Sequence, residues 1–272
     1  MPKFDITAFQ EKARHYREDI LTMVCEAGSG HIGGSFSGVE ILVSLYHYKM
    51  RHNPQNPSWS QRDRFIMSKG HASALLYVTL ADRGYFPKEE LKTFRKLNSR
   101  LQGHVYSGVP GVEFSTGALG QGLSVSCGIA LGVKLRQSDS RVYCFLGDGE
   151  IQEGQNWEAA MTASQHKLDN LCAILDQNKI QQNDLVSKIK NEEPLADKWR
   201  SFGWEVIEVD GHNFPELFAA LDALDRIKGK PVFIIAHTVK GKGVSFMENQ
   251  AKWHSRLPTP RERQAALEEL GG

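Results

Sequence analysis

The sequence predicts an α/β fold in which a doubly wound, mostly parallel sheet is flanked by helices. Two observations support this fold class: short apolar runs rich in β-favouring residues recur along the chain, and segments with helical spacing separate them. A helix between two strands provides the crossover that parallel strands require. No sharp change in composition divides the 272 residues, so we expect a single domain over residues 1–272.

Each expected element is justified by its pattern. Apolar runs that end at glycine or polar residues predict buried strands at 142–146 and 171–175, and further strands are predicted at 64–68, 204–209 and 231–236. Apolar residues near a period of 3.6 predict helices at 7–25, 38–48, from the turn 69–71 to about 82, 91–97, 123–136, 156–165, around 199, 214–224 and 261–270. Glycine, proline and polar residues predict loops at 28–34, 53–57, 104–114 and 178–194.

Composition and charge argue against several classes of protein. Lysine and arginine total 33 against 32 acidic residues, and this net charge of +1 gives no reason to expect a nucleic-acid partner. No apolar run approaches the ~20 residues of a membrane span, and the amino terminus lacks the apolar core of a signal peptide. The four widely spaced cysteines form no CxxC pair, which favours buried free thiols and a cytoplasmic location.

A metal site is predicted where two neighbouring strands end. Asp148 follows the strand 142–146 and Asn178 follows the strand 171–175, so both oxygen-bearing side chains lie at the carboxyl edge of the sheet, where such sheets bind ligands. A carboxylate, an amide oxygen and a backbone carbonyl, which we assign to Ile180, suit Mg²⁺. That ion completes its coordination with water and phosphate, so a Mg²⁺–diphosphate cofactor is expected.

Two glycine-rich segments allow both structural and functional interpretations. Residues 28–33 match G-x-G-x-x-G, but they follow a helical segment instead of a strand, so we interpret the match as coincidental. That loop either joins two helices or exposes its backbone beside a ligand and presents His31. Residues 117–122 open a helix and either allow tight packing or bring the backbone close to a diphosphate.

Four histidines lie in predicted turns or loops: His31, His71, His104 and His254. Imidazoles in such positions can bind hydroxyls and transfer protons near neutral pH. Glu153, near the start of the helix 156–165, either interacts favourably with the helix dipole or is a buried carboxylate at an interface. The sequence has neither a zinc-ligand spacing nor a G-x-S-x-G elbow.

Taken together, these motifs resemble those of the transketolase family. Gly147-Asp148-Gly149 followed by Asn178 resembles the thiamine diphosphate signature, and the finer match lies in segments 30–34, 68–72, 103–104, 116–122 and 147–154. The resemblance spans roughly residues 10–255, which correspond to the amino-terminal portion of a full-length transketolase. The chain is therefore similar to the amino-terminal subunit of a split transketolase.

The resemblance implies cofactors, partners and residue roles. Thiamine diphosphate would be held through Mg²⁺ on Asp148, Asn178 and the Ile180 carbonyl. Further cofactor contacts would come from His71, Gly117, Ala118, Leu119, Gly149, Asn178 and His254. Catalytic roles would fall to His31, His104 and His254, which would face the sugar, and to Glu153 at the subunit interface. A carboxy-terminal subunit with the pyrimidine-binding and C-terminal domains would complete an α2β2 enzyme that moves a two-carbon ketol unit between sugars or sugar phosphates.

The sequence departs from the family pattern at several positions, and three other functions remain as alternatives. Ala118 stands where proline is common, Val105 follows His104 in place of proline, and residues 181–183 depart from the usual continuation after Asn178. Alternatives are a deoxyxylulose phosphate synthase-like enzyme, the α subunit of a 2-oxoacid dehydrogenase, or a non-catalytic Mg²⁺–diphosphate-binding subunit. The four histidines favour the ketose-handling enzyme.

Overall fold

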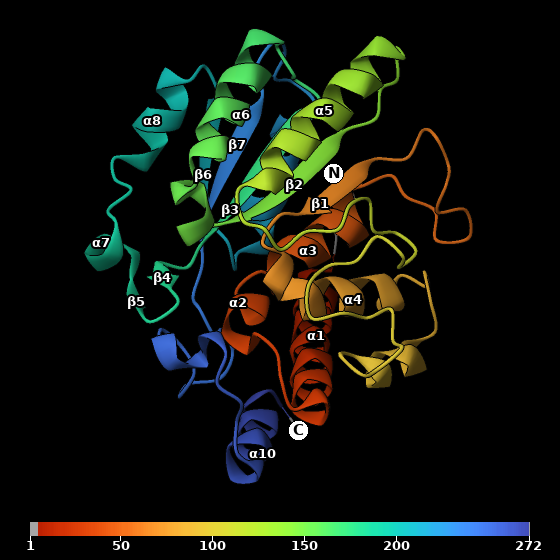
Figure 1. Cartoon of the computed structure of the whole chain (residues 1–272), viewed down its shortest axis with the longest axis vertical. Coiled ribbons are helices and arrows are strands. Elements are labelled where there is room, and N and C mark those ends of the chain that lie inside the picture. The colour runs from red at the N-terminus through yellow and green to blue at the C-terminus, as the bar shows by residue number, and fades with distance from the viewer. Residues whose placement is uncertain (1–4, 272) are drawn as a thin grey trace.

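A five-stranded parallel sheet organises the molecule in the computed structural model, which describes residues 5–271 (Figure 1). The strand order is β1-β2-β3-β7-β6, and every neighbouring pair is parallel. The bounds are β1 Arg64–Met67, β2 Val142–Gly147, β3 Leu171–Gln177, β6 Glu205–Asp210 and β7 Val232–His237. The predicted α/β class with helices flanking a parallel sheet is confirmed.

Helices connect and cover these strands. The α-helices are α1 Ile6–Ala27, α2 Ile32–Phe36, α3 Val39–Ser44, α4 Ser73–Asp82, α5 Gln121–Leu135, α6 Gly154–Gln165, α7 Val186–Ile189, α8 Leu195–Ser201, α9 Phe214–Ala223 and α10 Pro260–Glu269. A π-helix, η1, covers Leu45–Lys49. Short 3₁₀ segments are η2 Gly70–Ala72, η3 Lys88–Thr93, η4 Gly149–Gln152 and η5 Ala251–His254.

Both faces of the sheet are covered, because alternate side chains of its strands enter two different hydrophobic clusters. Along β2, Tyr143 and Phe145 join the cluster formed with α1, α3, α4 and α9, whereas Cys144 and Leu146 join the cluster formed with α5, α6 and α8. In the second cluster, Trp199 stacks on Phe233 with ring centroids 3.8 Å apart. Two packed faces explain why the strands are apolar at consecutive positions.

Local signals set the ends of several helices. Asp5 caps α1 through bonds from the backbone N–H groups of Thr7 and Ala8, and Gly28 ends that helix in the left-handed region. Thr259 and Glu262 form a reciprocal capping box at the start of α10. These signals explain why helices are found close to the predicted positions at both ends of the described chain.

The structure also corrects parts of the secondary-structure prediction. The predicted helix at 91–97 is wrong: a 3₁₀ segment, η3, ends at Thr93, and Arg95 and Asn98 adopt left-handed backbone conformations that interrupt any continuation. The loop predicted at 28–34 contains the start of α2, and the helix predicted at 38–48 divides into α3 and the π-helix. The polar loop 178–194 contains a β4–β5 hairpin, Ile180–Gln181 with Asp184–Leu185, and α7.

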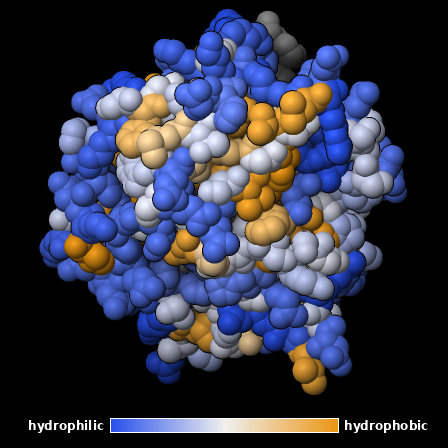
Figure 2. Space-filling view, turned by 45° about the horizontal axis from the view of Figure 1, so that its top comes forward, coloured by the Kyte–Doolittle hydropathy of each residue, from blue (hydrophilic) through white to orange (hydrophobic). Residues whose placement is uncertain are grey.

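Exposed hydrophobic residues gather on one side of the molecule (Figure 2). Figure 2 brings the top of Figure 1 forward and shows hydrophobic residues gathered on that side. Leu135 of α5 and Met161 of α6 are among the exposed large hydrophobic residues. Within residues 5–271, no helix combines the length and apolar character needed to cross a membrane. All four cysteines are free thiols; three are buried and Cys25 is half-buried.

Candidate active site

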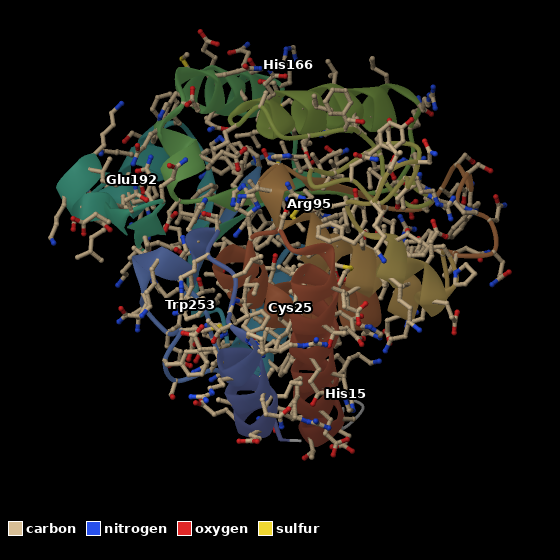
Figure 3. The ribbon with its side chains drawn as sticks, turned by 60° about the horizontal axis from the view of Figure 1, so that its bottom comes forward. His15, Cys25, Arg95, His166, Glu192 and Trp253 are labelled. Atoms are coloured by element: carbon tan, nitrogen blue, oxygen red, sulfur yellow. The ribbon has the colours of Figure 1, made fainter. Side chains whose placement is uncertain are left out.

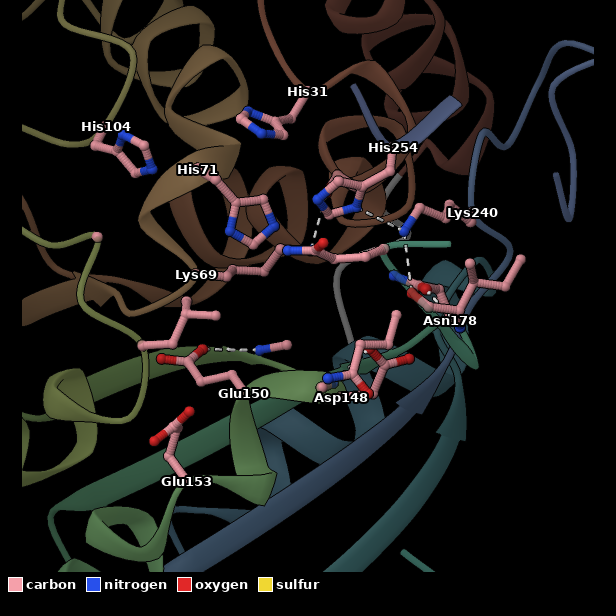
Figure 4. Close-up of a pocket in the computed structure, with 18 residues that line it drawn as sticks. His31, Lys69, His71, His104, Asp148, Glu150, Glu153, Asn178, Lys240 and His254 are labelled. Atoms are coloured by element: carbon pink, nitrogen blue, oxygen red, sulfur yellow. Dashed lines mark hydrogen bonds between the residues drawn. The ribbon is translucent and has the colours of Figure 1, made fainter. Parts of the chain in front are cut away.

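A cavity of about 410 Å³ lies at the carboxyl edge of the sheet (Figure 4). Four of its lining residues come shortly after strands: Lys69 after β1, Asp148 after β2, Asn178 after β3 and Lys240 after β7. β2 and β3 are direct neighbours, with Gly147 paired to Asp176, so the loops carrying Asp148 and Asn178 emerge side by side. The topology therefore gathers these groups as open α/β sheets do at their ligand-binding edge.

The structure brings nearly all predicted site residues together. Those that line the cavity are His31, His71, His104, Gly117, Leu119, Asp148, Gly149, Glu153, Asn178, Ile180 and His254. Ala118 is the exception, since its side chain is exposed outside this lining. The segment 28–34 follows α1 and not a strand, and it presents His31 to the cavity.

Four histidines form one wall of the cavity, opposite the acidic side chains in Figure 4. The ring centroid of His31 lies 5.2 Å from that of His71, 5.2 Å from that of His254 and 6.3 Å from that of His104. The buried Nδ1 of His31 has no hydrogen-bond partner within the described residues.

All four imidazoles are held neutral near pH 7. Burial, followed by the nearby His104 and Arg95, lowers the pKa of His31 to about 4. Burial and then Lys240 lower the pKa of His254 to about 3. Burial is also the first cause of the lowered pKa values of His71 and His104. Neutral imidazoles both donate and accept hydrogen bonds, so this wall suits hydroxyl groups.

The predicted metal ligands are buried at the opposite wall. Asp148 is 5 % exposed; one of its oxygens, Oδ1, accepts from the Gly149 N–H at 2.8 Å, and the other, Oδ2, has no partner among the described residues. Burial and the neighbouring Asp176 raise the pKa of Asp148 to about 6. Asn178 Oδ1 accepts from the Ile180 N–H at 3.2 Å, and its amide nitrogen faces Asp176 Oδ2 at 3.4 Å.

Two buried lysines join the site, and the sequence alone did not indicate a role for either. Lys240, 2 % exposed, donates to the Ile180 carbonyl at 3.0 Å and contacts His254 Nδ1 at 3.0 Å. Burial lowers its pKa to about 8. Lys69 is paired with the fully buried Asp176 and donates to the Gly34 carbonyl at 2.9 Å. The sequence feature that could have drawn attention to these lysines is the glycine after each of them, in Lys69-Gly70 and Lys240-Gly241.

These groups fit a Mg²⁺–diphosphate ligand. Asp148 carries an unpaired buried carboxylate oxygen. Within residues 5–271 Lys240 forms no ion pair, and its attraction to Asp148 acts across the cavity without direct contact. Buried charges are costly unless they are compensated. A metal ion would compensate Asp148 and a phosphate would compensate Lys240. Asn178 and the Ile180 carbonyl add the neutral oxygen ligands that Mg²⁺ accepts.

Two glutamates differ sharply in environment. Glu150, 2 % exposed, accepts from the backbone N–H groups of Gly120 and Gly147, each at 3.0 Å, and from the Ser68 hydroxyl. It therefore ties together the loops after β1 and β2 and the start of α5. Glu153 is exposed at the N-cap position of α6 and makes no capping bond.

Comparison with known proteins identifies the family. The family described as "Transketolase, thiamine diphosphate binding domain" matches residues 10–271. The chain belongs to this family. The resemblance to transketolase noted from the motifs is thus confirmed.

Curated relatives of this transketolase domain include separate subunits. The chain is 42% identical over 254 residues to one subunit of the apulose-4-phosphate transketolase of Phocaeicola vulgatus, covering 93% of this chain and 90% of that one. It is 42% identical over 262 residues to one subunit of the 6-deoxy-6-sulfo-D-fructose transketolase of a Clostridium strain, covering 96% and 95%.

The solved transketolase of Campylobacter jejuni superposes with a TM-score of 0.93 at 37% identity. The match covers 98% of this chain and 43% of that one, so the chain spans less than half the length of this solved relative.

Proposed function

We propose that this chain is the amino-terminal, cofactor-binding subunit of a split transketolase, forming one domain over residues 1–272. It would transfer a two-carbon ketol unit from a ketose to an aldose with thiamine diphosphate and Mg²⁺. The observation that carries the proposal is a single cavity with neutral imidazoles on one wall, the unpaired carboxylate oxygen of Asp148 on the other, and Lys240 bonded to both His254 and Ile180. Bound thiamine diphosphate would supply the group that accepts the electron pair when the sugar's carbon–carbon bond breaks.

The metal-binding end of the site would use oxygen ligands. Asp148, Asn178 and the Ile180 carbonyl would hold Mg²⁺. Lys240, Lys69 and His71 would surround the diphosphate with positive charge or N–H donors, and Gly117, Leu119 and Gly149 would add cavity lining next to the cofactor. The burial of Lys69, Asp148, Asn178 and Lys240 excludes water and strengthens each electrostatic contact.

The histidine wall would bind and orient the sugar. His31 and His104, which line the cavity, would each bind a sugar hydroxyl. Because Lys240 donates to Nδ1 of His254, the neutral imidazole carries its proton on Nε2 and can donate it there. Such hydrogen bonds fix the substrate in a reactive geometry and provide short proton-transfer distances.

A partner subunit would complete the site. Leu119 is 39% exposed and Glu153 is exposed, although both line the cavity. An exposed apolar group beside an exposed carboxylate at an active-site entrance supports docking of another polypeptide. Relatives named as subunits support the same conclusion. We propose a carboxy-terminal subunit with pyrimidine-binding and C-terminal domains, an α2β2 assembly, and a cytoplasmic location.

The test is co-expression of the two subunits followed by a donor screen with added thiamine diphosphate and Mg²⁺. We expect turnover with ketoses or ketose phosphates and an aldose acceptor. Turnover with pyruvate as donor in place of ketoses would instead favour a deoxyxylulose phosphate synthase-like enzyme or a 2-oxoacid dehydrogenase subunit. Cofactor binding without turnover of any donor would favour a non-catalytic subunit.

A further inference from the structure

A histidine outside the cavity contacts the backbone next to one of the cavity lysines. His212 lies in the loop after β6, and its side chain is 12% exposed. The Val239 N–H donates to its Nε2 at 2.9 Å, and its Nδ1 lies 2.9 Å from Oε2 of Glu40. Because a backbone N–H can only donate, Nε2 is the acceptor and Nδ1 carries the proton that is donated to the carboxylate. The two contacts therefore fix one tautomer of His212.

Glu40 is itself held in one orientation. It lies on α3 and is 6% exposed. Arg17 of α1 donates to both of its carboxylate oxygens, each at 2.8 Å, and to the Phe36 carbonyl at 3.0 Å. A buried guanidinium that binds a carboxylate through two N–H groups fixes its geometry. A chain of contacts thus runs from α1 through Glu40 and His212 to the backbone of Val239.

The residue after Val239 is Lys240, which the site requires in one position. Its ammonium group donates to the Ile180 carbonyl and contacts Nδ1 of His254, at 3.0 Å in each case. A lysine side chain is flexible, so placing its ammonium group depends on where the backbone is held. The contact of His212 with the preceding N–H is therefore a contact that orients Lys240.

The segment 238–241 has few other anchors. The Thr238 hydroxyl donates to Asp176, and the Gly241 N–H donates to the Gly33 carbonyl at 3.1 Å. The chain then continues to η5, where Trp253 lies beside the amino-terminal helices (Figure 3). Among the described residues, His212 is the side chain that hydrogen-bonds to the backbone of this segment.

We propose that His212 is a positioning residue: held by Glu40 and Arg17, it fixes the backbone at Val239 so that Lys240 is placed for the cofactor's diphosphate. This inference rests on the proposed function, in which Lys240 surrounds the diphosphate. His212 lies outside the cavity lining and touches no ligand there. It acts by preorganising the lysine, which lowers the ordering cost that binding would otherwise include.

The test compares His212→Asn with His212→Gln in the full chain. The asparagine amide reaches the position of Nδ1 and keeps the donor to Glu40, whereas the glutamine amide reaches the position of Nε2 and can accept from Val239. Calorimetry would measure the Kd of thiamine diphosphate in the presence of Mg²⁺. We expect Kd to rise about tenfold in His212→Asn, because a buried N–H loses its acceptor, and most of the affinity to return in His212→Gln.

A matched control separates positioning from a general loss of stability. His52 is a half-buried histidine that also uses both ring nitrogens, with the Tyr46 carbonyl at 2.9 Å and the Tyr85 hydroxyl at 3.2 Å. His52→Asn should lower the urea midpoint of the cofactor-free chain and leave Kd unchanged. Lys240→Met adds a second readout, since His212→Asn should weaken binding far less once the ammonium group is absent.

Each outcome decides between the two roles. An unchanged Kd in His212→Asn, an equal loss in His212→Gln, or an equal loss in His52→Asn would overturn the positioning role. If His212→Asn does not fold, Glu40→Asp replaces it, because the shorter side chain withdraws the carboxylate from Nδ1 and should raise Kd in the same direction. A wild-type chain that bound no thiamine diphosphate would refute the proposed function instead.

Discussion

At the scale of single residues, the site is defined by buried charges that form no direct ion pair. Asp148 and Lys240 are both almost fully buried, and neither has an oppositely charged group in direct contact among the described residues. Such groups weaken a fold unless a ligand compensates them. Their retention in one cavity is the strongest structural argument that the cavity binds a charged cofactor.

Asp148→Ala tests the metal assignment. We expect calorimetry to show no Mg²⁺-dependent binding of thiamine diphosphate, because the carboxylate ligand is gone. We also expect the cofactor-free chain to remain folded, since the variant removes a buried oxygen that has no partner. Asp197→Ala, an exposed substitution on α8, is the control. Unchanged cofactor affinity in Asp148→Ala would refute the assignment.

The histidine wall predicts a pH dependence of stability. The folded chain keeps His31 neutral down to its pKa of about 4, whereas the unfolded chain protonates histidine near 6.5. As pH falls between these values, the unfolded state binds more protons and the free energy of unfolding decreases, by up to about 1.4 kcal/mol per pH unit for this group. Urea unfolding between pH 7 and 4.5 should show a shallower slope for His31→Gln. Equal slopes would contradict the prediction.

Residue patterns predicted some of these groups and missed others for physical reasons. Asp148 and Asn178 were predictable because each follows an apolar strand, and polar groups at that edge bind ligands. Lys69 and Lys240 were missed because lysine is nearly always a surface residue. Their burial depends on contacts with Asp176 and Ile180 that only the folded chain creates.

At the scale of elements, Glu150 connects the parts that build the cavity. It joins the loop after β1, the start of α5 and the end of β2 through three hydrogen bonds. The cavity-lining loop around Gly117 precedes one of these anchors, Gly120. The position of that loop therefore depends on a buried carboxylate that does not itself need to touch the substrate.

Glu150→Ala should reduce stability and weaken cofactor binding together. The loss of one acceptor leaves two backbone N–H groups and a hydroxyl without a partner, which corresponds to about 2–4 kcal/mol in the free energy of unfolding. Chemical denaturation and thiamine diphosphate titration would measure the two effects. Glu158→Ala, a substitution on α6, should change both by little. A stable Glu150→Ala chain with normal cofactor affinity would show that this carboxylate is not an anchor.

Strands were easier to predict from the sequence than the shortest elements. The five strands were predictable within a few residues. β2, β3 and β7 are packed on both faces, which gives each a continuous apolar run, whereas the edge strand β6 combines apolar and charged residues. Short pieces such as η3 and the β4–β5 hairpin were not, since a few hydrogen bonds define them and no apolar periodicity does. The left-handed backbone conformation of Arg95 has no signal in the sequence, because the residue is not glycine.

At the scale of the whole molecule, part of the cavity lining faces solvent. Leu119 and Glu153 line it while remaining exposed, as expected of a site shared with another polypeptide. We therefore expect the purified chain to bind Mg²⁺ and thiamine diphosphate without turning over a ketose and an aldose.

A coupled assay with and without the carboxy-terminal subunit tests this expectation. Turnover should require both subunits, and its rate should saturate as the second is titrated. Sustained turnover by this chain alone would disprove the split-enzyme proposal. Cofactor binding by the isolated chain, measured in parallel, would separate a missing partner from a misfolded protein.

The cavity unites residues from opposite ends of the sequence. His31 and His254 lie with ring centroids 5.2 Å apart, and the Gly241 N–H donates to the Gly33 carbonyl at 3.1 Å. During synthesis, the first of these residues leaves the ribosome long before the last strand has been translated. Such distant contacts form late in folding. We therefore expect the vitamin derivative to be loaded only after translation, and a chain truncated before His254 to hold it poorly even where the sheet has formed.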